Sequence, residues 1–227
     1  MIIHGIKEQM VVKAASLLHL ACETFIRKKG CAVMAVPGGR SVTGILEQLA
    51  SLNIEWQKVH IFMLDERLVP GDHQDSNCRL VQDSLGNSLV AGRVHPFHYD
   101  ADNAEKSVDS YGDELGRFGG RFDIVLASSG EDGHIGSLFP NHPSVMEKGD
   151  RFILVNDSPK PPSSRISASV KLLRRSDTGV LLFLGGQKRN ALRAFCDSAL
   201  TPVQCPAKII TMMPTYHVLT DQEVNLP

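Results

Sequence analysis

Residues 31–36 have the sequence Cys-Ala-Val-Met-Ala-Val, and they are followed at once by Pro37-Gly38-Gly39-Arg40-Ser41. An unbroken apolar run is typical of a strand that is covered on both faces of a parallel sheet. The two glycines and the serine behind it favour a tight turn into the start of a helix. This pattern of strand, turn and helix decides the fold class that the sequence predicts.

Five further apolar runs follow along the chain: residues 59–64, 122–127, 152–155, 179–184 and 208–212. Between them, apolar residues recur at steps of three and four, which predicts helices over residues 11–22, 45–52, 104–118 and 187–200. Strands that alternate with helices indicate an α/β fold of three layers, a largely parallel sheet flanked by helices. Because no linker or internal repeat interrupts residues 1–227, we expect a single domain.

The composition is typical of a soluble globular protein. Of the 227 residues, 42% are hydrophobic and 22% are charged, and the formal net charge is −1. This balance offers no general attraction to nucleic acid or to anionic membranes, and no apolar run approaches the ~18 residues of a membrane span. The first residues lack the basic and apolar parts of a signal peptide, so we expect a cytoplasmic protein.

The cysteines and histidines give little indication of a metal site. The five cysteines are an odd number and form no Cys-x-x-Cys pair, which favours reduced thiols over disulfides or a zinc ribbon. The segment His95-Pro96-Phe97-His98 is a weak candidate, because catalytic zinc normally has three protein ligands and no third is evident nearby. We therefore expect neither a metal nor a cofactor.

Candidate site residues lie where the predicted strands end, because ligands of open α/β sheets bind beyond the carboxyl ends of the strands. In the turn Gly38-Gly39-Arg40-Ser41, backbone amides and the Arg40 charge could hold an anion; an ordinary helix cap is the alternative. In Asp65-Glu66-Arg67, Arg67 could bind a phosphate while a carboxylate holds it. The alternative is a solvated charge cluster. Ser76-Asn77 could simply cap the next helix.

Two more candidates follow later strands. The loop Ser128-Ser129-Gly130-Glu131-Asp132-Gly133-His134 contains a histidine, the side chain best suited to proton transfer near neutral pH. Its place in a glycine-rich loop at a strand end favours a functional histidine over a structural one. The segment Ser158-Pro159-Lys160-Pro161-Pro162 predicts a stiff loop that presents Lys160 to a ligand, with Arg165 close by. Both cations could equally lie free at the surface.

Together these segments resemble the 6-phosphogluconolactonase family of the NagB-like α/β fold, over about residues 30 to 200. The resemblance is carried by three strings: Asp65 to Pro70 with Ser76-Asn77, Asp132-Gly133-His134-Ile135-Gly136-Ser137-Leu138-Phe139-Pro140, and Ser158 to Pro162 with Arg165-Ile166-Ser167. The chain differs from the family's usual pattern at Ser128, where glycine is common. It also has Gly38-Gly39-Arg40-Ser41 where Gly-Gly-Ser-Thr is frequent.

The resemblance implies an enzyme of the oxidative pentose phosphate pathway that hydrolyses the δ-lactone of 6-phosphogluconate. It assigns His134 as the general base that activates water, and Asp132 and Asp65 as acids that orient His134 or Arg67. The phosphate would be held by Gly38, Gly39, Arg40, Ser41, Arg67, Lys160 and Arg165, with the two arginines favoured because guanidinium binds phosphate through two hydrogen bonds. The expected partner is a small phosphorylated sugar lactone, and the expected state is a monomer or weak homo-oligomer.

Two other functions fit the same fold. Glucosamine-6-phosphate deaminases/isomerases also carry an Asp-Gly-His-Ile segment, but theirs continues into Asn-Glu-Pro instead of Ser137-Leu138-Phe139-Pro140. A non-catalytic sugar-phosphate sensor, such as the ligand-binding half of a regulator, would carry a DNA-binding helix-turn-helix, and none is evident before the first predicted strand.

Overall fold

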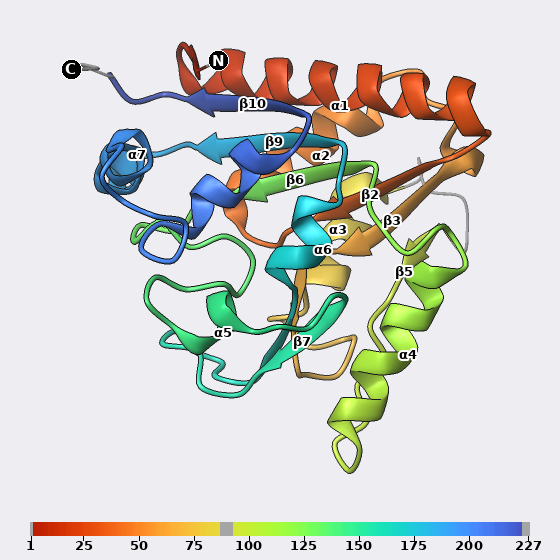
Figure 1. The fold of residues 1–227 in the computed structure, drawn as a ribbon. Helices are drawn as coiled ribbons and strands as arrows, with labels where there is room; N and C mark the ends of the chain where they lie inside the picture. The colour runs from red at the N-terminus through yellow and green to blue at the C-terminus, as the bar shows by residue number, and fades with distance from the viewer. Residues whose placement is uncertain (1, 87–92, 224–227) are drawn as a thin grey trace.

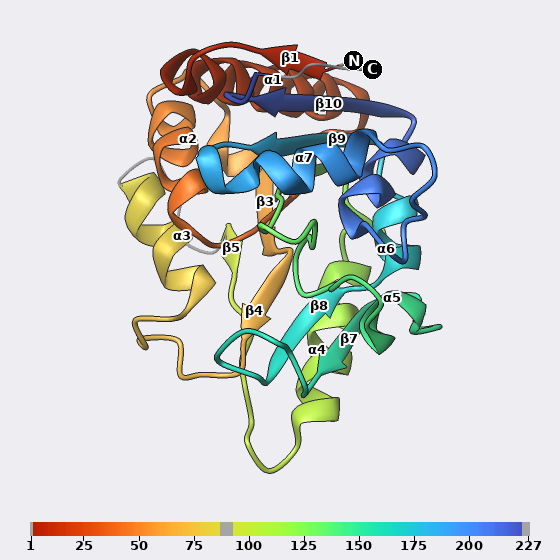
Figure 2. The ribbon, with the colours of Figure 1, turned by 90° about the vertical axis from the view of Figure 1, so that its left-hand side faces the viewer.

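A parallel sheet forms the centre of the computed structural model, which describes residues 2–86 and 93–223 apart from the side chain of Arg40. Within these ranges seven strands pair in the order β1-β10-β9-β6-β2-β3-β5, and every pair is parallel. Their bounds are β1 (Ile2–His4), β10 (Thr215–Thr220), β9 (Thr178–Phe183), β6 (Ile124–Ser128), β2 (Ala32–Val36), β3 (Val59–Met63) and β5 (Val94–His95). The carboxyl ends of β10, β9 and β6 point to the left in Figure 1, and the arrowhead of β10 also points to the left in the view of Figure 2.

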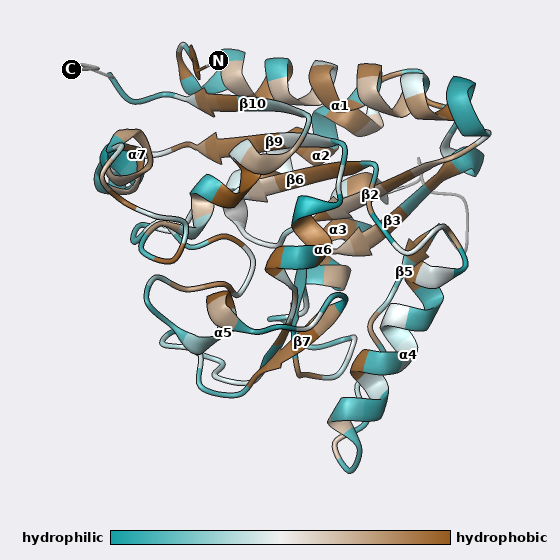
Figure 3. Cartoon of the chain, in the orientation of Figure 1, coloured by the Kyte–Doolittle hydropathy of each residue, from teal (hydrophilic) through white to brown (hydrophobic). Residues whose placement is uncertain are grey.

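Helices cover both faces of this sheet, which explains why its strands are apolar without alternation. One core joins Ala32, Met34 and Val36 of β2 to α1 (Lys7–Lys29), α2 (Arg40–Ala50) and α3 (Asn77–Leu85). The other core joins Val33 and Ala35 to α4 (Ala104–Gly116), α6 (Val170–Arg174), α7 (Arg189–Cys196) and the 3-10 helix η4 (Pro206–Met212). In Figure 3 the strands are mainly hydrophobic, whereas α1 and α4 carry bands of both kinds. The predicted three-layer α/β class is confirmed.

A second sheet, of three antiparallel strands, adjoins the first. Among the described residues its order is β4-β8-β7, with β4 (Asp65–Arg67), β8 (Arg165–Ala168) and β7 (Phe152–Val155). The chain leaves β3 at Met63 and enters β4 at Asp65, so Leu64 lies between the two sheets. Its backbone N–H donates to the carbonyl of Val36 (2.7 Å), and its carbonyl accepts from the N–H of Ala168 (2.8 Å). Figure 1 shows β7 and α5 (Pro143–Met146) set apart from the large sheet.

Most predicted elements are confirmed, and one is wrong. The runs at residues 31–36, 59–64, 122–127 and 179–184 are parallel strands, and residues 152–155 form a strand of the antiparallel sheet. Residues 208–212 are not a strand but part of η4, where the neighbours Ile209 and Ile210 are both buried. A short apolar run does not distinguish a strand from a buried helical turn, and Pro206 at the first turn favours the latter.

The four predicted helices correspond to α1, α2, α4 and, for residues 187–200, η3 (Gly186–Lys188) followed by α7. All five cysteines are free, as expected. Burial raises the pKa of the Cys22 and Cys78 thiols to about 12, so neither is a nucleophile near neutral pH. Within residues 2–86 and 93–223, no helix combines the length and apolar character needed to cross a membrane.

Candidate active site

The loop after β6 holds His134 in a fixed place. Three of its apolar side chains, Ile135, Leu138 and Phe139, are buried in the core. The hydroxyl of Ser137 donates to Oδ2 of Asp65 (2.8 Å), which joins the loop to the antiparallel sheet. The loop therefore has a hydrophobic anchor and a polar one on the carboxyl side of His134.

The side chains of His134 and Asp132 form a hydrogen bond, with 2.5 Å between Nδ1 and Oδ1. Burial acts to raise the pKa of Asp132, but hydrogen bonds from His134 and the charges of His134 and Lys160 outweigh it and hold that pKa below its usual range. An ionised carboxylate only accepts hydrogen bonds, so Nδ1 of His134 carries a proton and Nε2 is the acceptor. In the described part of the chain, no group is hydrogen-bonded to Nε2.

At two positions only glycine fits, because a neighbouring side chain packs directly against the backbone there. A Cβ atom on Gly130 would lie 2.0 Å from Nδ1 and Cε1 of His134. A Cβ atom on Gly38 would lie 1.8 Å from Oδ1 of Asn77. Neither site can accept a larger residue without displacing the side chain beside it, so both glycines serve packing in the loops that end β6 and β2.

His134 faces a cleft of about 440 Å³ at the carboxyl ends of the parallel strands. Six of the predicted site residues line it: Gly38, Gly39, Ser41, Arg67, Lys160 and His134. They come from segments up to 122 positions apart (residues 38 and 160). Gly38, Gly39, Ser41 and His134 meet because they follow the parallel strands β2 and β6, whose carboxyl ends share one edge of the sheet. Arg67 and Lys160 come instead from the antiparallel sheet that adjoins it. The predicted cluster is therefore brought together by the fold.

The cleft also contains side chains that the sequence reasoning missed, above all Lys7, Gln187 and Lys188. Lys188 follows the Gly185-Gly186 turn after β9, so the strand-end rule that identified the other candidates also applied to it. Lys7 follows β1, which has only three residues and gives no clear apolar run. The sequence therefore contained evidence that Lys188 follows a strand, but it contained no such evidence for Lys7.

The charges in the cleft favour an anionic ligand. Its described lining includes the cations Lys7, Arg67, Lys160 and Lys188 and the acid Glu131. Burial lowers the pKa of Lys188, and the charge of Lys160 lowers it further, whereas Glu131 and Asp132 raise it. Lys160 and Lys188 are thus close enough to the His134 loop to interact with its acidic residues.

Arg67 lines the cleft at the end of β4, but no carboxylate of the described residues pairs with its guanidinium. Nη1 donates to the carbonyl of Asp75 (2.7 Å), and Nε is buried without a partner in the described chain. The adjacent Glu66 accepts from the backbone N–H groups of Arg67 (2.8 Å), Asn77 (2.7 Å) and Cys78 (2.7 Å). The expected carboxylate support of Arg67 is thus corrected: Glu66 holds its backbone and the start of α3.

Arg165 is not among the described residues that line the cleft, which argues against the direct phosphate contact predicted for it, and Asp65, predicted to orient His134 or Arg67, does not line the cleft either. Asp65 is buried, accepts from Ser137, and has Oδ2 at 3.9 Å from Nη1 of Arg165. Arg165 is also buried and donates to three carbonyls, of Lys160 (3.0 Å), Pro161 (3.0 Å) and Pro162 (2.9 Å). A guanidinium used in this way holds the Lys160 loop in place and leaves few donors for a phosphate.

Two remaining predictions concern the starts of helices. Ser76 caps α3, because its hydroxyl accepts from the backbone N–H of Arg79 (3.2 Å), which confirms the capping interpretation. Arg40 is the first residue of α2, and its side chain lies outside the described residues.

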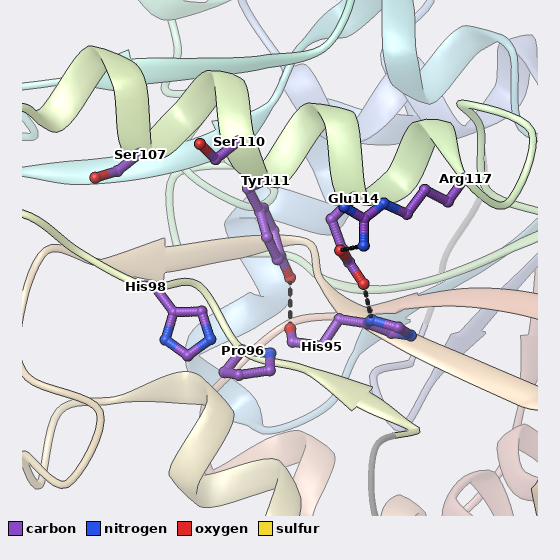
Figure 4. Close-up of a pocket in the computed structure, with 8 residues that line it drawn as sticks. All are labelled: His95, Pro96, His98, Ser107, Ser110, Tyr111, Glu114 and Arg117. Carbon is purple, nitrogen blue, oxygen red and sulfur yellow. Dashed lines mark hydrogen bonds and ion pairs between the residues drawn. The ribbon is translucent and has the colours of Figure 1, made fainter.

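A second pocket, of about 310 Å³, lies between α4 and residues 95–98 (Figure 4). In its wall, Nδ1 of His95 is hydrogen-bonded to Oε1 of Glu114 (2.9 Å), and Nε2 of His95 to Nδ1 of His60 (3.0 Å). Nε2 of His60 in turn accepts from Arg93 (3.0 Å). In residues 2–86 and 93–223, no three His, Cys, Asp or Glu residues are placed to hold a metal ion, so the structure offers no ligand set around His95 and His98.

The family model described as glucosamine-6-phosphate isomerases/6-phosphogluconolactonase matches residues 6–218. The 6-phosphogluconolactonase of Borreliella burgdorferi is 32% identical, over 83% of this chain and 83% of its own. That of a Synechocystis species is 31% identical, over 97% of this chain and 95% of its own.

Solved structures agree on the fold. A 6-phosphogluconolactonase from Shewanella baltica has a TM-score of 0.87 at 24% identity, covering 97% of each chain. A monomeric glucosamine-6-phosphate deaminase has a TM-score of 0.82 at 22% identity, covering 98% of this chain and 97% of its own. The architecture alone does not separate the two activities, whereas the two relatives reported above 30% identity are both 6-phosphogluconolactonases by name. The chain belongs to the glucosamine-6-phosphate isomerase/6-phosphogluconolactonase family, and the expected membership of the 6-phosphogluconolactonase family is confirmed.

Proposed function

We propose that this chain hydrolyses the δ-lactone of 6-phosphogluconate to 6-phosphogluconate, with His134 as the general base. The observation that carries the proposal is the arrangement at His134: Asp132 holds Nδ1, and Nε2 has no partner among the described residues and faces a cleft whose described lining includes four cations. The names of the relatives support the substrate class. The string Ser137-Leu138-Phe139-Pro140 after the histidine favours this reaction over deamination.

In the proposed mechanism, Nε2 of His134 takes a proton from a water molecule as the water oxygen attacks the lactone carbonyl carbon. The ionised Asp132 then stabilises the imidazolium. When the bond between the carbonyl carbon and the ring oxygen breaks, the imidazolium returns the proton to that oxygen, which becomes a free hydroxyl. The new carboxylic acid still carries the second proton of the water molecule, and it releases this proton to the solvent to become a carboxylate. Lys160 and Lys188 are the nearest candidates to stabilise the negative charge that develops on the carbonyl oxygen.

The phosphate is assigned to the turn at Gly38 and Gly39, with Ser41 and Arg67. These groups combine free backbone amides at the start of α2, a hydroxyl and a guanidinium with unused donors. Binding energy at the phosphate positions the distant carbonyl carbon beside His134. Asp65 and Arg165 act as positioning residues, the first for the His134 loop and the second for Lys160.

The test is to add purified protein to freshly generated 6-phosphogluconolactone and to follow acid release against spontaneous hydrolysis. We expect a clear acceleration, and no ammonia when the same preparation receives glucosamine 6-phosphate. Ammonia without faster lactone opening would replace this proposal with deamination. Binding of 6-phosphogluconate with neither activity would favour a sensor.

A further inference from the structure

Two serine hydroxyls meet in the cleft, and the mechanism above gives only one of them a role. Oγ of Ser41 lies 2.9 Å from Oγ of Ser128. Ser41 belongs to the first turn of α2, and Ser128 is the last residue of β6, so the contact joins two elements 87 positions apart. Both residues line the cleft, and within the described residues neither hydroxyl has another hydrogen-bond partner.

This pair has one more hydrogen than its own contact uses. Each hydroxyl carries one hydrogen, and the contact between them takes only one. The other hydrogen finds no acceptor in the described chain and is therefore available to a ligand oxygen. A hydroxyl that accepts one hydrogen bond while it donates another is also a stronger donor, because the two bonds polarise each other.

The surroundings decide which serine donates to the ligand. Ser41 lies in the first turn of an 11-residue helix with no acidic residue in that turn, and the N-terminus of a helix favours an anion. Gly39 beside it has a φ of 101° and open space where a Cβ would be. An anion there would take the hydrogen of Ser41, which leaves Ser128 as the donor to Ser41.

We propose that Ser128 is a positioning residue: its hydroxyl donates to Oγ of Ser41, so that the hydroxyl of Ser41 donates to an oxygen of the substrate's phosphate. This inference rests on the proposed function and adds to it a residue that determines preference for the phosphorylated substrate. Ser128 itself does not touch the substrate, and its removal leaves the Ser41 hydroxyl free to rotate away from the phosphate.

The test compares Ser128→Ala and Ser128→Thr, which keeps a hydroxyl, on the phosphorylated and the unphosphorylated lactone. For Ser128→Ala we expect KM for the phosphorylated lactone to rise about 3- to 10-fold, as for one lost hydrogen bond, with kcat unchanged within about twofold. The unphosphorylated lactone should show no change, and Ser128→Thr should be close to the parent. Ser16→Ala removes an exposed hydroxyl on α1 and is the matched control.

Ser41→Ala and the double variant show whether Ser128 acts through Ser41. We expect the double variant to have the KM of Ser41→Ala alone, because Ser128 then has nothing to orient. Effects that multiply would mean that Ser128 contacts the substrate itself, and an unchanged KM in Ser128→Ala would equally overturn the proposal. Thermal unfolding checks that each variant is folded, and Ser128→Cys replaces the alanine variant if that one is not.

Titration with inorganic phosphate separates this inference from the proposed function. If the parent protein does not accelerate lactone opening, the proposed function fails, and the serine pair is still tested by phosphate affinity. There we expect Ser128→Ala to weaken phosphate binding by about the same 3- to 10-fold. Equal affinity in the parent and Ser128→Ala would overturn the role of Ser128 whatever the reaction is.

Discussion

Among the described residues, two imidazoles are hydrogen-bonded to a carboxylate, and only one of them keeps its other ring nitrogen unpaired there. Nδ1 of His134 is bound to Asp132 in the cleft, and Nδ1 of His95 is bound to Glu114 beside the second pocket (Figure 4). The difference lies at the other ring nitrogen. Nε2 of His134 has no partner among the described residues, whereas Nε2 of His95 is taken by His60.

The bonds around His95 leave no nitrogen free. Arg93 can only donate, so Nε2 of His60 accepts and Nδ1 of His60 carries the proton. Nδ1 of His60 then donates to Nε2 of His95, and Nδ1 of His95 donates to Glu114. This chain runs in one direction from Arg93 to Glu114 and ties β3 and β5 to α4.

Burial also affects the two histidines beside the second pocket, His60 and His95. It lowers the pKa of His60 to about 4, with the charges of His95 and Arg93 acting in the same direction, and it also lowers the pKa of His95. Both rings are therefore neutral near pH 7 and form structural bridges, and His95 stacks on Phe62 with 4.3 Å between ring centroids. A carboxylate at one nitrogen orients an imidazole, but a free second nitrogen makes it a base.

The largest expected effect is that of the His134→Asn substitution, which tests whether His134 is the general base. The variant keeps a polar side chain and loses the proton acceptor, so kcat should fall ~10²–10⁴-fold, while 6-phosphogluconate still binds. A folded variant with more than about a third of the parent's activity would reduce His134 to a loop-shaping role.

The carboxylates Asp132 and Glu114 should differ in their effect on kcat. Asp132→Asn removes a charged hydrogen bond of roughly 1.5–3 kcal/mol from the imidazolium, so kcat should fall about 10- to 100-fold. Glu114→Gln, the matched change in the other pair, should leave kcat within about twofold and reduce the free energy of unfolding. Steady-state kinetics and urea unfolding of both variants measure these effects. An equal loss of kcat in both variants would contradict the assignment of Asp132, and not Glu114, as the carboxylate that supports catalysis.

The Arg67→Ala substitution tests whether the cleft beside His134 binds the phosphate of the substrate. Loss of a charged contact of roughly 1.5–3 kcal/mol should lower kcat/KM for the phosphorylated lactone about 10- to 100-fold. Unphosphorylated gluconolactone should be much less affected, since it lacks the phosphate that Arg67 is proposed to bind. Equal losses on the two lactones would show that Arg67 is structural or contacts the reacting end.

His60, which is hydrogen-bonded to His95 of the second pair, should contribute to the dependence of stability on pH. The folded chain holds His60 neutral down to about pH 4, whereas the unfolded chain protonates it near its usual value of 6.5. The unfolded state therefore binds more protons between these values, and the free energy of unfolding should fall as the pH drops from about 6.5 to 4. Urea unfolding at several pH values should show a smaller fall in His60→Gln, and an identical fall would exclude His60 as a cause.

The smallest expected effect is that of metal removal. Dialysis against EDTA should leave kcat unchanged, because each proton transfer is assigned to His134 and the described residues contain no three-ligand cluster. Activity that is lost on dialysis and restored by zinc would contradict the mechanism. The histidines at positions 95, 98 and 142 would then become candidate ligands.

The α/β class and six of the residues that line the cleft follow from the sequence alone. Continuous apolar runs require cover on both faces, and parallel strands bring their carboxyl ends to one edge. The residues after residues 31–36 and 122–127 therefore lie at the same edge of the sheet in any such fold, and the strand order of this structure makes them neighbours. For this reason Gly38, Gly39 and His134 could be assigned to one site before any geometry was known.

Only the tertiary structure decided the roles of the buried charges. The antiparallel pairing of β4 with β8 sets Arg67 opposite Arg165, yet only Arg67 lines the cleft, because the guanidinium of Arg165 is bonded to the carbonyls of its own loop. Asp65 pairs with Ser137, 72 positions away. Such bonds depend on strand register and on which atoms face each other after packing. A run of charged residues in the sequence specifies neither of these.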